Sequence, residues 1–358
     1  MRTLISIPLL LVLVGCADLG YYWHNASGHL ELMSERVDIE TLIEDEQTEN
    51  DLRERLLLVQ EIRRFSIDRL DLPDNGSYDS YVQLDNPYVV QNVFAAPEFS
   101  TRLYQWCYPV IGCASYRGYF DEKRLNNYVE ELEAQGLEVS IGRVPAYSTL
   151  GWFDDPVLSS FIDWPDYRLA GLIFHELTHQ QLFIDDDTTF NESLASAVQQ
   201  QGTRLWLAHN NRDSELAAFE RWLKYRAEVI ALIVATRQGL DELYASELAE
   251  PEMRIAKAER FDVARQQHGK IAQRHGVTRG FTAWFAADLN NARIGSVAAY
   301  RARVPAFVNM MNSMDNDFAR FYAYAEEISA LPKDRRDQCL DAWEQQTAID
   351  SEACRSQG

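Results

Sequence analysis

The sequence GLIFHELTHQ, residues 171–180, places two histidines and a glutamate in a strongly apolar stretch. Apolar side chains recur at positions 169, 172, 173 and 177, which is the spacing of one helix face. This pattern predicts a buried helix over residues 167–183, followed by an acidic loop over residues 184–189. A second helix is expected from about residue 189 to residue 208. Because the loop is short, the two helices should pack as antiparallel neighbours.

His175 and His179 are separated by one helical turn, and Glu176 directly follows the first histidine. Positions i and i+4 lie on one face of a helix, so both imidazoles can bind the same ion. Neutral imidazole nitrogens suit Zn²⁺. Glu176 is about 100° around the helix from His175, where it can flank the ion without binding it. From there it can take a proton from an attacking water, as in zinc-dependent peptidases.

A catalytic zinc site needs a third protein ligand and one open coordination position. Glu192, in the sequence FNESLA, follows His179 by thirteen residues and lies early in the second predicted helix. Antiparallel helices would bring it beside the histidines, so we predict that Glu192 is the third ligand. The alternative is a capping box, because Thr189 and Glu192 fit the T-x-x-E pattern. Asn191 and Ser196 are candidates for hydrogen bonds that orient the ligands.

The composition excludes one class of partner. The chain has 358 residues, of which 46% are hydrophobic and 25% are charged, enough for a sizeable buried core. Its formal net charge is −21, which is unfavourable next to phosphate backbones. We therefore expect no nucleic-acid partner.

The N-terminus carries an export pattern. A mostly apolar run over residues 4–14 is too short to span a bilayer as a mature helix. It ends in LVGC, which resembles the bacterial lipobox, where the chain is cut before the cysteine and the thiol is acylated. Residues 1–15 would be the signal peptide, and lipidated Cys16 would tether the protein to a membrane of the cell envelope. Ala17 favours the periplasmic face of the outer membrane by the lipoprotein sorting rule; a plain secretory signal is the alternative.

The other cysteines fit an oxidising compartment. An even number of cysteines in an exported chain indicates disulfides, and three pairings are possible. Proximity in sequence favours Cys107 with Cys113 and Cys339 with Cys354. A cysteine metal site is the less favoured alternative, because the chain has no CxxC.

The remaining patterns predict an α+β fold: a small sheet in the N-terminal half packed on the HExxH helix, and a mostly helical C-terminal half. We expect one domain over residues 16–358, with a mixed part over 17–165 and a helical part over 166–358. The elements expected before the HExxH helix are helices over residues 37–65 and 121–135 and strands over 88–96 and 137–144. After residue 208, long helices are expected to break near Gly239, Gly276 and Gly295.

The segments YRGYF, AYSTLGWFDDP, LIFHELTHQ and FNESLA, with the lipobox and WCYPVIGC, resemble the bacterial putative aminopeptidase family of zinc lipoproteins. HExxH followed by NExxA is also similar to the gluzincin class. The resemblance implies that His175, His179 and Glu192 are metal ligands and that Glu176 is the general base. Two features depart from thermolysin-like gluzincins: the gap before the glutamate is shorter, and Ser196 stands where many have an acidic residue.

The resemblance also implies a substrate side. In gluzincins an edge strand before the ligand helix pairs with the peptide, and STLGWF, residues 148–153, lies at a suitable position. There we expect Gly151 to allow close backbone approach and Trp152 to contact substrate, although a core role for Trp152 is equally compatible. Tyr147 is the candidate for stabilising the developing oxyanion, with Tyr119 as a second.

Together these features predict a periplasm-facing, membrane-anchored zinc peptidase that hydrolyses peptides, with aminopeptidase action implied by the resemblance. The acidic pairs and triplets near 154–155 and 185–187 could hold a substrate ammonium but are favoured as turn and cap residues. One alternative is a non-catalytic zinc-binding lipoprotein that serves structure or partner binding. Another is a zinc hydrolase for a different amide, such as a cell-wall peptide crosslink.

Overall fold

The structure is a computed structural model of the chain. It describes residues 21, 27–108, 112–146, 149, 153–185, 187–278, 280–298, 303–346 and 354. The strands are β1 (Val37–Asp38), β2 (Ser80–Val82), β3 (Val90–Pro97), β4 (Trp106–Tyr108), β5 (Gly112–Ala114), β6 (Arg117–Tyr119), β7 (Leu137–Val144) and β8 (Val157–Leu158). The helices are α2 (Ile39–Glu44), α3 (Asn50–Leu70), α4 (Glu122–Ala134), α5 (Asp166–Gln181), α6 (Thr188–His209), α7 (Asp213–Tyr244), α8 (Glu250–His275), α9 (Thr282–Ala286), α10 (Asn291–Ala298), α11 (Val304–Ser313), α12 (Phe318–Ser329) and α13 (Lys333–Glu344).

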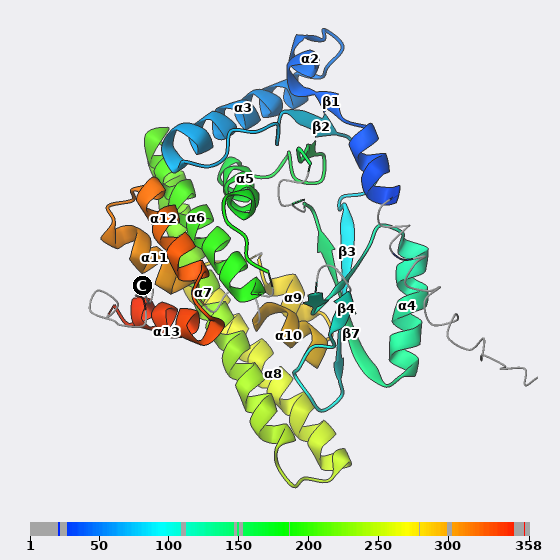
Figure 1. The fold of residues 1–358 in the computed structure, drawn as a ribbon. Helices are drawn as coiled ribbons and strands as arrows, with labels where there is room; N and C mark the ends of the chain where they lie inside the picture. Colours follow the sequence, from blue (N-terminus) through cyan, green and yellow to red (C-terminus); the bar gives the residue numbers. More distant parts are fainter. Residues whose placement is uncertain are drawn as a thin grey trace, which may run out of the picture.

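The predicted α+β class is confirmed, with small sheets in the N-terminal half and helices in the C-terminal half. Two sheets have three strands each, in the orders β1-β2-β8 and β6-β3-β7, and β4 pairs with β5. In the second sheet β3 is central and antiparallel to both neighbours. Figure 1 shows α4 on one side of this sheet and the α5–α6 pair across from its other side.

Three apolar clusters hold these layers together. The largest surrounds α5 and α6 and includes residues of α3, α11, α12 and α13. A second fills the long α7–α8 hairpin, and a third lies between α4 and the β6-β3-β7 sheet. Helix α5, which carries the HExxH residues, is therefore part of the main core, and the β6-β3-β7 sheet has a small core of its own.

The prediction of one continuous helix over residues 37–65 is wrong, because the chain forms β1, α2 and the first part of α3 there. The interruption lies at Asp45. Its side chain accepts a hydrogen bond from the Gln47 N–H (2.9 Å) and its carbonyl accepts one from the Thr48 N–H (3.1 Å). These local bonds compete with the helical ones and end α2.

Two of the glycines predicted to break helices lie inside helices instead. Gly239 lies inside α7, and a Cβ there would come within 2.4 Å of Arg260 Nη1 on α8. Gly295 lies inside α10, where a Cβ would come within 2.8 Å of Leu103. At Gly295 glycine permits close approach of a neighbouring segment, whereas at Gly239 the space is filled by the end of the flexible Arg260 side chain. The third prediction is confirmed, because Gly276 ends α8 with a φ of 64°.

Both disulfides favoured by sequence proximity are present. Cys107 and Cys113 are bonded across the β4-β5 pair, and Cys339 on α13 is bonded to Cys354. Among the helices of the described residues, none is both long and apolar enough to cross a membrane.

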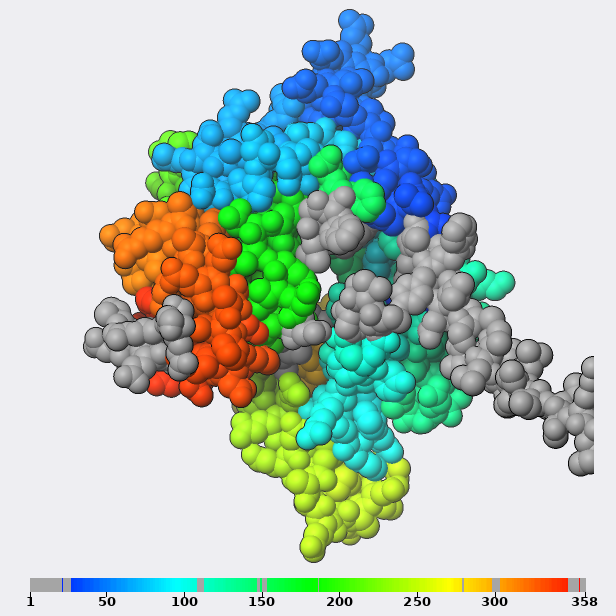
Figure 2. Space-filling view, viewed as in Figure 1, coloured from blue at the N-terminus to red at the C-terminus, as the bar shows by residue number. Residues whose placement is uncertain are grey.

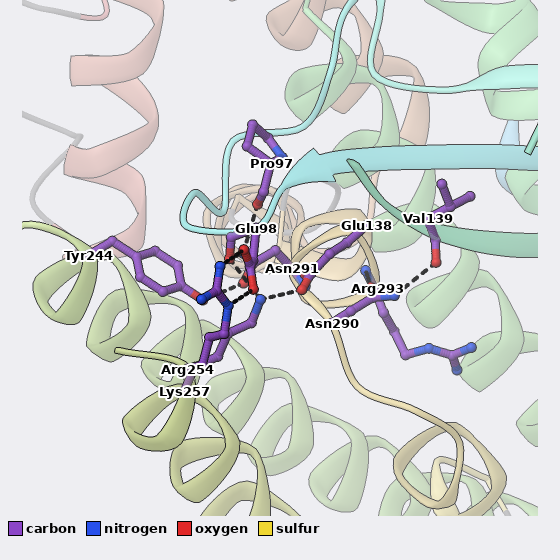
Figure 3. Close-up of polar contacts among 10 residues, drawn as sticks. All are labelled: Pro97, Glu98, Glu138, Val139, Tyr244, Arg254, Lys257, Asn290, Asn291 and Arg293. Carbon is purple, nitrogen blue, oxygen red and sulfur yellow. Dashed lines mark hydrogen bonds and ion pairs between the residues drawn. The ribbon is translucent and has the colours of Figure 1, made fainter. Parts of the chain in front are cut away.

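A polar cluster fastens the ends of β3 and β7 to α8 and α10 (Figure 3). Lys257 of α8 is buried, forms an ion pair with Glu138 of β7 and donates a hydrogen bond to the Glu98 carbonyl (2.7 Å). The Asn291 amide nitrogen donates to the carbonyls of Pro97 (3.0 Å) and Glu98 (2.8 Å), and the Asn291 backbone N–H donates to Glu138 (2.7 Å). This cluster fixes the sheet relative to the helical half.

The cluster predicts that its buried and exposed cations contribute unequally to the free energy of unfolding. Lys257→Met leaves the Glu138 carboxylate partly buried without its cation, so we expect the free energy of unfolding to fall by about 3–5 kcal/mol. Arg254 pairs with Glu98 at 2.6 Å, but its side chain is 48% exposed and solvent screens the pair. Arg254→Ala should therefore cost much less. Denaturant titrations at pH 7 measure both; equal losses would contradict the assignment.

Candidate metal centre

Helix α5 is anchored at its first residue. Asp166 accepts a hydrogen bond from Arg55 of α3 (2.5 Å) and another from Arg212, which immediately precedes α7 (2.7 Å). A carboxylate in the first turn also interacts favourably with the helix dipole. At the other end, the Leu182 N–H donates to the Thr178 carbonyl (3.0 Å), and the helix stops at Gln181. Neighbouring segments thus fix the start of the HExxH helix, and the helix ends on an ordinary i→i−4 hydrogen bond.

The second helix packs closely and antiparallel against α5 (Figure 1). Gly171 of α5 faces Thr203 of α6, where a Cβ would come within 3.0 Å of the threonine hydroxyl. Gly202 of α6 faces Phe174, where a Cβ would come within 2.9 Å of the ring. Because each glycine lacks a Cβ, the helices approach closely, and the early part of α6 lies beside the C-terminal turns of α5.

The linker between the helices is held by two side chains. The buried Asn191 amide accepts a hydrogen bond from the Ile184 N–H (3.0 Å) and donates one to the Ile184 carbonyl (2.8 Å). Asp187 is the N-cap of α6 and accepts from the Phe190 N–H (3.1 Å). The alternative capping box is wrong, because the cap is Asp187 rather than Thr189. Asn191 orients the linker rather than a ligand.

His175, His179 and Glu192 meet at one point. The two Nε2 atoms are 3.2 Å apart, and the Glu192 oxygens lie 3.4 Å from Nε2 of His175 and 3.6 Å from Nε2 of His179. The imidazole planes are nearly perpendicular, at 86°. Among the described residues, these three side chains form a group that could hold a metal ion, because one possible ligand atom from each lies within 4.8 Å of the others.

Burial determines the charge states of this group. The pKa of His179 is lowered to about 4, chiefly by burial and also by the neighbouring His175, while Glu192 opposes the shift. The pKa of Glu176 is raised to about 7, chiefly by burial and also by the charges of Glu192 and Asp155, while His175 opposes the shift. His179 is therefore neutral at pH 7, the form in which imidazole binds metals.

These residues fit a zinc ion. Two buried imidazole nitrogens and a carboxylate converge, although a neutral His179 supplies no positive charge to hold the carboxylate there. The other ring nitrogen of His179, Nδ1, is buried and has no hydrogen-bond partner among the described residues, so the outer-shell bond that usually orients a ligating imidazole is not seen there. A divalent cation between Nε2 atoms and the carboxylate would supply the missing charge, and a two-histidine, one-glutamate set is a known zinc ligand set. Ser196 does not contribute an observed contact: its hydroxyl is buried and has no hydrogen-bond partner in the described ranges.

A further carboxylate approaches Glu176 from another segment. Asp155 is 3% exposed and accepts hydrogen bonds from the Thr149 N–H (3.0 Å) and from Nε2 of Gln180 on α5 (3.1 Å). The Thr149 hydroxyl also accepts from the Phe153 N–H (3.1 Å). These bonds form a turn, so the strand expected over residues 148–153 is absent at Thr149 and Phe153, the two of its residues that the structure describes.

Several predicted residues receive no structural account. Cys16, Tyr147, Gly151 and Trp152 lie outside the described residues. Tyr119, the second oxyanion candidate, points away from the ligands. Its side chain is 6% exposed and belongs to the cluster between the sheet and α4.

Two aromatic residues border the site that the sequence patterns do not predict. The ring of Phe183, in the linker after α5, lies 6.3 Å from the His179 ring. Tyr116 lies just before β6, and its pKa is raised by partial burial and by the charges of Glu192 and Glu176. Phe183 lies in no quoted motif. Tyr116 is the first residue of the YRGYF segment, but its place at the site depends on how α5, α6 and the sheet pack together, which the segment alone does not show.

A family comparison agrees with this geometry. The sequence profile of the family described as "Putative aminopeptidase" matches residues 20–340, so the chain belongs to that family. The family description indicates a peptidase. A search of curated proteins and a search of solved structures each found no significant match.

The cap of α6 predicts a pH-dependent contribution to stability. Burial raises the pKa of Asp187, but the Phe190 N–H, Arg336 and Lys333 outweigh this and hold it below its usual value. A lowered folded-state pKa stabilises the protein above about pH 4, and this stabilisation is lost as pH falls through the folded-state pKa. Asp187→Asn keeps a capping side chain but unpairs buried Arg336, and should cost about 3 kcal/mol at pH 7.

Denaturant unfolding of wild type and Asp187→Asn between pH 7 and pH 3 measures this contribution. The difference between the two proteins should shrink as the pH falls below about 4. A difference that stays constant over the whole range would contradict the charge-based account.

Proposed function

We propose that this chain is a zinc-dependent peptidase that acts as an aminopeptidase. The observation that carries the proposal is the convergence of His175, His179 and Glu192, with Glu176 on the neighbouring position of the same helix. Membership of the putative aminopeptidase family supports the peptidase class independently. His175, His179 and Glu192 would hold the ion.

A bound Zn²⁺ would polarise the substrate carbonyl and lower the pKa of water. The chain supplies the remaining chemistry. Glu176 is buried beside the ligands, so its carboxylate would take the proton from the attacking water and pass it to the leaving amine. The apolar core around α5 holds this carboxylate at a fixed position and restricts its contact with bulk water.

The oxyanion formed during attack needs a hydrogen-bond donor. Tyr147 remains our predicted donor, with Gly151 and Trp152 as predicted substrate contacts. Tyr116 is a second candidate, because its hydroxyl is subject to the charges of both Glu192 and Glu176.

The proposed setting is the cell envelope. Cys16 would carry the lipid, and the protein would face the periplasm, with the outer membrane favoured by Ala17. Two disulfides are consistent with an oxidising compartment of this kind.

The ligand assignment predicts metal content. Purified wild type should contain about one zinc ion per chain, and His175→Ala or Glu192→Ala should reduce this to below about one-tenth, because each removes one of three protein ligands. His209→Ala and Asp185→Asn are matched controls, since both side chains are exposed and lie outside the cluster. Elemental analysis of the purified proteins measures the ratio. Full zinc content in Glu192→Ala would refute the ligand set.

The role of Glu176 predicts a separation of activity from metal binding. Glu176→Gln has nearly the same shape but no basic carboxylate, so kcat for peptide hydrolysis should fall by about 10²–10⁴-fold. Zinc content and thermal unfolding should stay close to those of the wild type. The assay uses a broad peptide library with free and acetylated N-termini, and an aminopeptidase should cleave only the free ones.

The same assay separates the alternatives. If zinc-loaded wild type cleaves no peptide in the library, the non-catalytic binding module becomes the better account. Cleavage of acetylated peptides would indicate an endopeptidase. Cleavage restricted to crosslinked cell-wall peptides would assign the activity to that other class of amide.

A further inference from the structure

Two exposed aromatic side chains, Phe183 and Tyr116, border the candidate metal centre. Among the described residues, the exposed aromatic side chains are Tyr104, Tyr116, Phe153 and Phe183. Phe183 is in the linker that joins the two ligand helices, and Phe153 is in the turn bonded to Gln180 of α5. In Figure 2 the surface is hollowed between the green α5–α6 region and the strands coloured cyan to teal. Grouped aromatic exposure beside such a hollow is typical of a binding surface.

Phe183 is held in place although its ring is exposed. The residue before it, Leu182, is bonded to Thr178 (3.0 Å), and the residue after it, Ile184, is bonded twice to Asn191 (3.0 and 2.8 Å). The backbone on both sides is therefore fixed. The ring itself is 43% exposed and meets the His179 ring edge to face. A rigid aromatic surface next to a ligand loses little entropy when it binds a substrate.

Tyr116 presents a second aromatic surface from the sheet. Its side chain is 36% exposed, and its ring centroid is 6.0 Å from that of Phe94 on β3. Gly142 on β7 leaves room for Phe94, because a Cβ there would come within 3.3 Å of that ring. Partial burial and the charges of Glu192 and Glu176 raise the pKa of Tyr116, so its phenol lies within electrostatic reach of the ligand cluster.

We propose that Phe183 and Tyr116 form the two walls of a substrate subsite that takes a large apolar or aromatic side chain flanking the scissile bond. This inference rests on the proposed peptidase function. The aromatic walls favour apolar side chains, which lose water when they enter. A carboxylate side chain would lose its hydration against these aromatic walls, and the nearby carboxylates of Glu176 and Asp155 add repulsion, so an acidic substrate side chain is rejected.

Two series of peptides test the subsite, each with Phe, Leu, Ala or Asp at one of the two residues that flank the scissile bond. Zinc-loaded wild type should prefer Phe or Leu over Ala by at least about tenfold in kcat/KM in one series, with Asp the poorest substrate. Phe183→Ala should lower this preference at least fivefold, mainly through KM, and Phe183→Leu should recover part of it. Tyr116→Ala should lower it as well.

Tyr104→Ala is the matched control, because Tyr104 has the same 43% exposure but packs on Trp106 in the cluster on the α4 side of the sheet. It should leave the preference unchanged. A second readout is calorimetric binding of the preferred peptide to zinc-loaded Glu176→Gln, which should weaken when Phe183→Ala is added.

The outcomes distinguish the two proposals. Cleavage of Phe and Ala peptides at equal efficiency, or a preference that Phe183→Ala leaves intact, overturns the subsite while the peptidase assignment stands. Absence of cleavage of every peptide by zinc-loaded wild type overturns both.

Discussion

The close antiparallel packing of α5 and α6 is the constraint on which the candidate site depends. His175 and His179 share a helix face by local geometry alone, but Glu192 reaches them only because the second helix lies against the first. Gly171 and Gly202 allow that approach, since a Cβ at either position would meet the facing helix. Asp187 then sets where α6 begins. A shift of one residue at this start would turn Glu192 by about 100° around the helix and away from the histidines.

The sheet supplies what the helix pair lacks. Helices α5 and α6 carry the proposed metal ligands and the proposed general base, but a substrate would also need a surface facing them. The β6-β3-β7 sheet has its own small core with α4. Its position relative to α5 is therefore set elsewhere, where Glu138 of β7 contacts Lys257 of α8 and Asn291 of α10 (Figure 3). These contacts are polar and directional, which fixes orientation as well as distance. The site therefore depends on helices that are remote from the HExxH sequence.

The contrast between the local helix pair and the sheet held by remote helices explains which features the sequence could predict. The HExxH helix, the following helix and strand β7 follow from spacing within each segment, and the placement of Glu192 follows from a short loop. The two disulfides follow from proximity. Phe183 carries no local signal, and in the YRGYF segment the sequence favours Tyr119 over Tyr116. The places of Phe183 and Tyr116 arise from contacts between segments that are distant in sequence. Gly295 shows the same limit: its sequence context indicates a helix break, but it lies inside α10, where Leu103 approaches it closely.

The electrostatics of the site provide the strongest link between fold and chemistry. Glu176 and Asp155 are buried near each other, and Glu192 lies beside both histidines. Burying like charges together opposes folding unless a cation or a proton compensates. Desolvation shifts Glu176 toward its protonated form and His179 toward its neutral form, so the protein alone relieves only part of this cost. A divalent cation at the three converging ligands would compensate the remainder, and the same charge would then be available to a reacting carbonyl.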